Sequence, residues 1–98
     1  NTSVPWDDVN IQGPVYLGSS VKIEPGATIE GPCWIGHASV VRSGAKVTRS
    51  ILLEYTRIAA GMHFSEMIVS PDYCVNRQGE TLYRGDETAS LRWGDARA

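Results

Sequence analysis

A chain of 98 residues is long enough for one small domain and too short for two separate cores. Its 9 basic and 11 acidic residues give a net charge of −2, so we expect no nucleic-acid partner and no binding to an anionic membrane. No apolar run approaches the roughly 20 residues of a membrane span, no signal peptide is evident, and 42% hydrophobic residues favour a folded chain.

The N-terminal segment precedes any regular pattern. The chain opens with Asn1-Thr2-Ser3 and lacks an initiator Met, so we expect a segment of a longer protein, with residues 1–8 as a linker or cap that follows an upstream domain. The cysteines, Cys33 and Cys74, allow one disulfide at most and have no zinc-site spacing. Reduced thiols and a cytoplasmic location are the favoured interpretation.

From residue 9 onward, aliphatic side chains recur at every sixth position. They are Ile11, Leu17, Ile23, Ile29, Ile35, Val41, Val47 and Leu53. Two positions before them stand mostly small residues, namely Val9, Val15, Val21, Ala27, Cys33, Ser39, Ala45 and Ile51. A spacing of two puts both residues on one face of a strand, whereas a helix needs spacings of three and four. The triplets between the first seven pairs all contain Gly, which turns a corner at positive φ without a Cβ penalty.

A longer period of eighteen residues overlies the unit of six. Ile11-Gln-Gly-Pro-Val-Tyr-Leu-Gly18 returns as Ile29-Glu-Gly-Pro-Cys-Trp-Ile-Gly36, and Val47-Thr-Arg-Ser-Ile-Leu-Leu53 begins a third copy. Three strands per period predict a triangular coil whose equivalent residues stack along the axis. We expect the register to slip by one residue after Leu53 and the solenoid to end near Ser70. The inward residues after the slip are then Thr56, Ile58, Met62, Phe64, Ile68 and Ser70.

Residues 71–98 follow the repeats. The stretch from Tyr73 to Tyr83 predicts a β-hairpin with its turn near Gln78-Gly79. The tail that follows is polar apart from Leu91 and Trp93. Because a solenoid end exposes unpaired strand edges, we expect the hairpin and tail to cap it.

The hexads of residues 9–70 resemble the hexapeptide-repeat proteins, whose fold is an all-β, left-handed parallel β-helix. The resemblance implies about three to four triangular coils, and the handedness comes from the family. The stretch from Arg49 to Ile58, the later Ile68-Val69-Ser70 and the tail from Gly85 to Asp95 are similar to the C-terminal domains of sugar-phosphate nucleotidyltransferases. Among these, the mannose-1-phosphate guanylyltransferases are the most similar.

This resemblance implies a parent enzyme that transfers a nucleotidyl group to a sugar 1-phosphate, with Mg²⁺, and releases pyrophosphate. GTP with mannose 1-phosphate is the favoured pair, and adenosine or thymidine nucleotides with glucose are alternatives. The catalytic domain of such an enzyme needs a glycine-rich loop followed by basic residues, which this sequence lacks, so we expect no catalytic, cofactor-binding or metal-binding residue here. The expected role is structural, with the upstream catalytic domain and further copies of the chain as partners.

Two alternatives from other classes stay open. One is an acyltransferase that uses His37 as a base at a trimer interface, with coenzyme A or an acyl carrier as donor. The other is a scaffold without enzymatic activity. A polar corner side chain is the favoured interpretation of His37, because the long inserted loop common in acyltransferases is missing. His63 points from another side and no third histidine exists, so zinc is not expected. The carboxylates read as solvated surface groups are Asp7, Asp8, Glu24 and Glu30.

The residue between each inward pair points outward, so every side of the prism carries an outer ladder. The polar ladder of the first side is Asn10, Thr28, Lys46 and His63, and the mixed ladder of the third side is Lys22, Val40 and Arg57. The ladder predicted for the second side is apolar throughout and consists of Tyr16, Trp34, Leu52 and Val69. A continuous apolar strip with aromatic members is typical of a contact surface. We therefore predict an interface there with another subunit or domain, the alternative being that the tail covers it through Trp93 on Trp34.

Overall fold

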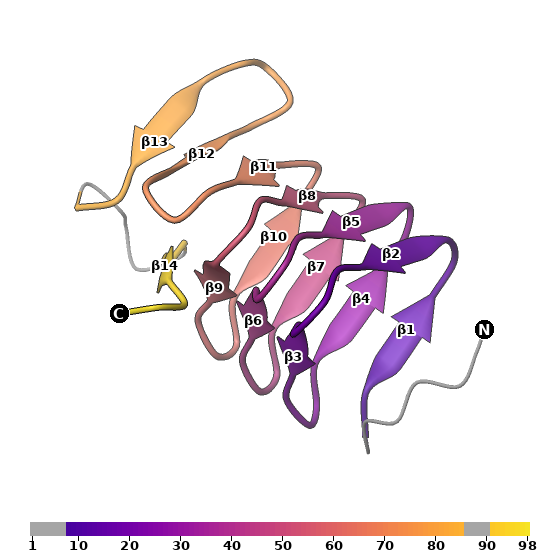
Figure 1. Ribbon diagram of the computed structural model, residues 1–98. Helices are drawn as coiled ribbons and strands as arrows, with labels where there is room; N and C mark the ends of the chain where they lie inside the picture. Colours follow the sequence, from indigo (N-terminus) through magenta and orange to yellow (C-terminus); the bar gives the residue numbers. More distant parts are fainter. Residues whose placement is uncertain (1–7, 86–90) are drawn as a thin grey trace.

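The computed structural model describes residues 8–85 and 91–98. Throughout this described part the chain runs through short strands joined by tight corners, with no helix. Figure 1 shows three stacks of strands that form the sides of a prism, with the N-terminal coil at one end and a hairpin at the other.

Each coil contributes one strand to each of three sheets. The first sheet has the order β1 (Asn10–Gln12), β4 (Thr28–Glu30), β7 (Lys46–Thr48) and β10 (His63–Ser65). The second has the order β13 (Thr81–Tyr83), β12 (Tyr73–Val75), β11 (Ile68–Val69), β8 (Ile51–Leu52), β5 (Cys33–Ile35) and β2 (Val15–Leu17). The third has the order β14 (Trp93–Asp95), β9 (Thr56–Ile58), β6 (Val40–Val41) and β3 (Lys22–Ile23). Strands of successive coils pair in parallel, and β12, β13 and β14 pair antiparallel.

One column of apolar side chains fills the centre of the prism. Its fully buried members are Ile29, Ile35, Val41, Val47, Leu52, Ile58, Phe64 and Val69. Register pairs each with its equivalent in the next coil, such as Ile29 with Val47 and Ile35 with Leu52. Burial of such a side chain contributes about 1.5–3 kcal/mol, so the stack of coils is stabilised along its length. The predicted all-β parallel β-helix of hexapeptide repeats is confirmed.

The corner after the second sheet needs glycine because the coils approach closely there. A Cβ on Gly36 would lie 2.8 Å from the carbonyl oxygen of Leu52 and 2.9 Å from the amide nitrogen of Glu54 in the next coil. The amide of Gly36 donates a hydrogen bond of 2.8 Å to that same oxygen of Leu52. The glycine thus lets the corners stack at hydrogen-bonding distance.

The register slips at the corner between the first and second sheets. In the first two coils this corner holds the pairs Gly13-Pro14 and Gly31-Pro32, whereas in the next two it holds a single residue, Arg49 or Glu66, with φ of 43° and 56°. The amide of Arg49 donates to the carbonyl of Glu30, as the amide of Gly31 does to Gln12, so Arg49 replaces Gly31. The proline has no counterpart, which shortens the coil by one residue.

The predicted position of the slip, after Leu53, is therefore wrong. Because the residue is lost before β8, Leu52 and Val69 point inward and are fully buried. Ile51 and Ile68, expected inside, are 41% and 40% exposed. The alternation of strands moves each of these side chains to the opposite face when the register shifts by one.

The predicted hairpin is confirmed. Strands β12 and β13 pair antiparallel and extend the second sheet beyond β11. The Asn76 side chain closes the loop by accepting hydrogen bonds from the amides of Gln78 and Glu80, and Gly79 takes a φ of +84°.

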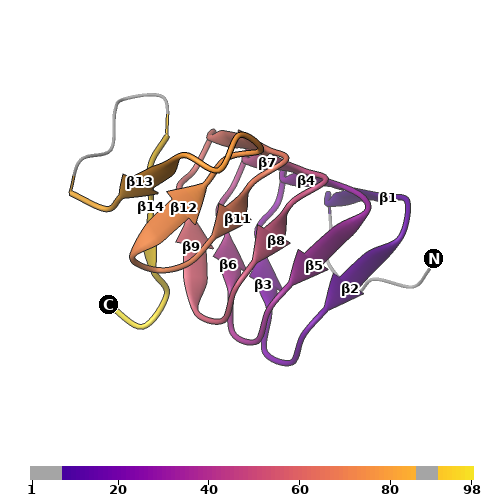
Figure 2. The same ribbon diagram turned by 90° about the horizontal axis from the view of Figure 1, so that it is seen from above.

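The described part of the tail caps the solenoid end on the third sheet. Strand β14 runs antiparallel to β9 and occupies the place where a fourth coil would put its third strand (Figure 2). Trp93 is buried and meets Phe64 edge to face at 6.2 Å. The alternative in which Trp93 packs on Trp34 is therefore wrong. The linker or cap predicted for residues 1–8 lies outside the described residues except for Asp8.

Candidate interaction surface

The outer face of the second sheet carries a row of exposed apolar side chains, here called the apolar strip and composed of Tyr16, Trp34, Ile51 and Ile68. Register aligns them one above another, Tyr16 beside Trp34, Trp34 beside Ile51 and Ile51 beside Ile68. The two aromatic rings are each 50% exposed and stack with centroids 4.1 Å apart and planes inclined by 24°. The row follows the solenoid axis.

This row corrects the residues predicted for the interface. Tyr16 and Trp34 lie where the sequence places them, but Leu52 and Val69 belong to the core and cannot contact a partner. Ile51 and Ile68 take their places because of the shortened corner. The signal was present in the sequence, since Arg49 stands where the earlier coils have Gly and Pro together.

The hairpin continues the same face. Val75 pairs with Ile68, and the rings of Tyr73 and Tyr83 meet at 6.4 Å on the neighbouring strands. Tyr83 is 58% exposed. The apolar face thus extends beyond the last parallel strand.

A hollow of about 370 Å³ borders the strip on the side where the strands begin. Its lining residues are Arg49, Ile51, Glu66, Met67, Ile68, Val75, Asn76 and Arg77. The Glu66 carboxylate forms ion pairs with the guanidinium groups of Arg49, at 3.1 Å, and of Arg77, at 2.9 Å. Two guanidinium groups share one carboxylate, so the described lining carries a net charge of +1.

A second hollow of about 600 Å³ borders the strip on the side where the strands end. Its lining residues are Trp34, Leu53, Glu54, Tyr55, Ser70, Pro71, Asp72 and Arg97. Two carboxylates and one guanidinium give this described lining a net charge of −1. The Arg97 guanidinium lies 4.3 Å from the Tyr55 ring centre and is held by Asp95 at 2.9 Å. Hydrogen bonds from Arg97 lower the pKa of Asp95 to about 2.

His37 lies in the corner between the second and third sheets. Its ring is half-buried and meets the Tyr55 ring edge-on at 5.5 Å. The backbone carbonyl of His37 accepts a hydrogen bond from the amide of Tyr55. These contacts are those of a corner side chain, and among the described residues no carboxylate or hydroxyl is seen to orient the imidazole as a base.

His63 lies on the first sheet, and its Nε2 is 3.4 Å from the Thr48 hydroxyl oxygen. The structure does not bring it together with His37. Across residues 8–85 and 91–98, no three histidine, cysteine or acidic side chains gather as metal ligands would. The carboxylate of Glu24 instead forms an ion pair with Arg42 at 3.0 Å, and that of Glu30 forms one with Lys46 at 3.7 Å.

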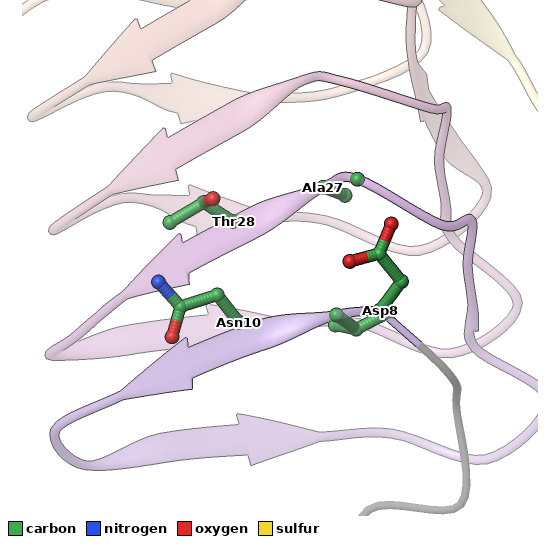
Figure 3. Close-up of a pocket in the computed structure, with 6 residues that line it drawn as sticks. Asp8, Asn10, Ala27 and Thr28 are labelled. Carbon is green, nitrogen blue, oxygen red and sulfur yellow. The ribbon is translucent and has the colours of Figure 1, made fainter.

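A further hollow of about 290 Å³ lies at the outer edge of the first coil (Figure 3). Asp8, Asn10 and Thr28 point toward it with polar groups, and the carbonyl of Asp8 accepts a hydrogen bond from the amide of Gly26 at 2.7 Å. Asp8 is the one charged residue in its described lining. A single carboxylate beside an amide and a hydroxyl does not supply an acid–base pair.

Both cysteines are free and buried, so each fills space in the core. Burial raises the pKa of both thiols. Neither therefore has the lowered pKa of a reactive cysteine. Within the described residues, the chain forms no helix long and apolar enough to cross a membrane.

Residues 14–49 match the family of the bacterial transferase hexapeptide (six repeats). The matched stretch is a little over a third of the chain and lies within the coils of the prism, so the chain is similar to hexapeptide-repeat proteins there. Over 93 residues it is 36% identical to a UTP–glucose-1-phosphate uridylyltransferase of Synechocystis sp., an alignment that covers 95% of the chain. The domain spans about a quarter of that relative's length, since the alignment covers 24% of it. The similarity supports the expected likeness to hexapeptide domains of sugar-phosphate nucleotidyltransferases, and not the finer likeness to mannose-1-phosphate guanylyltransferases.

Proposed function

We propose that this hexapeptide-repeat domain is the structural C-terminal domain of a sugar-1-phosphate nucleotidyltransferase. The observation that carries the proposal is the 36% identity to a uridylyltransferase over nearly the whole domain, hairpin and tail included. The architecture fits a structural role, because a rigid prism with a capped end presents a defined outer face. The free, buried thiols favour the cytoplasm as the location of the enzyme.

The reaction would take place in a catalytic domain outside these residues. That domain would transfer a nucleotidyl group from a nucleoside triphosphate to the phosphate of a sugar 1-phosphate and release pyrophosphate. Mg²⁺ would neutralise the triphosphate there. The described carboxylates do not fit this metal, because they do not gather as ligands and Glu24 and Glu30 are paired with cations.

Two substrate pairs have separate support. The name of the relative makes UTP with glucose 1-phosphate the first pair to test. The expected resemblance of the domain to those of mannose-1-phosphate guanylyltransferases makes GTP with mannose 1-phosphate the second.

The test is an assay of the full-length protein with Mg²⁺ against a panel of nucleoside triphosphates and sugar 1-phosphates, following pyrophosphate release. We expect turnover with one matched pair and none when either substrate or Mg²⁺ is omitted. The absence of pyrophosphate release with every pair of the panel would overturn the proposal.

A variant of His37 distinguishes the proposed nucleotidyltransferase from the acyltransferase alternative. His37→Ala should leave the nucleotidyl transfer within about twofold of the unchanged protein, because the ring of His37 packs against Tyr55 in the stacked corner of the next coil, as a structural side chain does. Transfer of acetyl groups from acetyl-coenzyme A that His37→Ala abolishes would instead support the acyltransferase.

A further inference from the structure

We propose that the outer face of the second sheet binds the same face of a second copy of this chain, related by a two-fold axis parallel to the solenoid axis. The inference rests on the structural role proposed above and names the partner of the apolar strip. Its basis is the shape of the face, its apolar centre and the opposite charges on its two sides.

The centre of the face is apolar along its whole length. The four side chains of the apolar strip are 40–50% exposed, whereas Leu52 and Val69, their neighbours in β8 and β11, are fully buried. A continuous row of this kind is rare on a free surface. Tyrosine and tryptophan are the side chains that most often anchor the middle of an interface.

The shape of the face suits another sheet. Six strands of the second sheet lie side by side, and the outward side chains of successive coils are in register. Sheet faces pack on each other about 10 Å apart through rows of apolar side chains. A standard interface buries roughly 800 Å² on each partner, a modest share of the 5334 Å² of accessible surface of this chain.

The charges on the two sides of the strip are complementary. The hollow where the strands begin has a net charge of +1, and the hollow where they end has a net charge of −1. Strand β8 illustrates the pattern, since Arg49 precedes it and Glu54 follows it at the same level of the solenoid. Both side chains are exposed.

These charges select the orientation. A two-fold axis along the solenoid lays the strip of one copy on the strip of the other and exchanges the two sides. Arg49 of one copy then faces Glu54 of its partner. An axis along the strand direction would instead bring like sides together and set arginine against arginine, which is unfavourable at short range.

The first test is the oligomeric state of the 98-residue chain by sedimentation velocity over a concentration series. We expect a dimer, and Trp34→Glu should raise its dissociation constant by roughly thirtyfold, as for the loss of a central aromatic contact. Ile51→Glu is a second variant on the strip that leaves the aromatic stack in place. Val40→Glu is the matched control, because Val40 points outward on the third sheet between Lys22 and Arg57.

The second test addresses the orientation through charge reversal. Arg49→Glu and Glu54→Arg should each weaken the dimer about threefold to tenfold, and the double variant should restore it. If the single variants weaken the dimer and the double variant does not restore it, the orientation with the two-fold axis along the solenoid would be overturned. A chain that stays monomeric at all concentrations, or dimers that tolerate Trp34→Glu and Ile51→Glu but not Val40→Glu, would overturn the proposed face.

The outcomes also separate this inference from the proposed function. A monomeric chain whose full-length parent still releases pyrophosphate would refute the second copy and leave the enzyme class standing. In that case the parent's catalytic domain would be the occupant of the strip, and hydrogen exchange at Ile51 and Ile68 in the parent would be slower than in the isolated chain. A dimeric chain from a parent without nucleotidyl transfer would refute the enzyme class alone.

Discussion

Adjacent residues Ile51 and Leu52 provide a sensitive test of the shortened corner. Leu52 is fully buried between Ile35 and Val69, whereas Ile51 is 41% exposed on the strip. Truncation of a fully buried leucine removes its transfer free energy and leaves a cavity, so Leu52→Ala should cost about 3 kcal/mol, within the usual range of about 2–5 kcal/mol. Ile51→Ala leaves no enclosed cavity and should cost less than about 1 kcal/mol.

The assay is thermal and urea unfolding followed by circular dichroism, with both substitutions made in the Trp34→Glu background so that association does not contribute. For a domain of this size, about 3 kcal/mol corresponds to a fall in Tm of roughly 12–24 °C, and Ile51→Ala should lower Tm by less than about 8 °C. Equal losses, or a larger loss for Ile51→Ala, would refute the register and with it the composition of the apolar strip. The unfolding slope with urea should stay unchanged, because both variants expose the same surface on unfolding.

Three further predictions concern the corner, the tail and the core. Gly36→Ala should destabilise the fold by about 1–3 kcal/mol, because the new Cβ would lie 2.8 Å from the Leu52 carbonyl oxygen, and urea unfolding measures this. Hydrogen bonds from Arg97 hold the pKa of Asp95 at about 2, below its unfolded value near 4, so their stabilisation is present above pH 4 and is lost as pH falls toward 2. Tm measured from pH 5 to pH 2 should therefore fall less steeply in Asp95→Asn, and identical slopes would contradict this pairing. Burial raises the pKa of the Cys74 thiol, so a thiol-specific disulfide reagent should modify Cys74 in the native chain at least tenfold more slowly than in urea.

The comparison of sequence and structure is clearest at the corners. The first two coils keep glycine and proline together at the first corner, and there the inward residues, such as Ile29 and Ile35, lie where the period of six predicts them. The third coil lacks the proline, and the predicted register fails from Ser50 onward. Between the two shortened corners the inward positions return to their predicted places at Thr56 and Ile58, and the failure recurs after Glu66, where Ile68 is exposed and Val69 is buried.

The sequence predicted that the second side carries an apolar row, but it did not predict all the residues of that row correctly. A row of outward apolar residues on the second side followed from the alternation of strands, and Tyr16 and Trp34 were placed correctly. Ile51 could not be told from Leu52 by composition, because the segment from Ile51 to Leu53 consists of three aliphatic residues in succession. Hydrogen bonds between coils settle the choice, since the amide of Gly36 binds the carbonyl of Leu52.

By itself, the sequence determined that the chain is a β-solenoid of triangular coils, because small and aliphatic residues at spacings of two and six suit no other regular structure. It also determined the hairpin, because Gly79 marks a turn between two apolar segments. The tertiary structure decided where the coil shortens and that the tail closes the end through Trp93 instead of covering the apolar strip. The physical reason is that both features depend on contacts between coils: each corner must align its amides with the carbonyls of the coil below, and a tail pairs with whichever strand edge remains open.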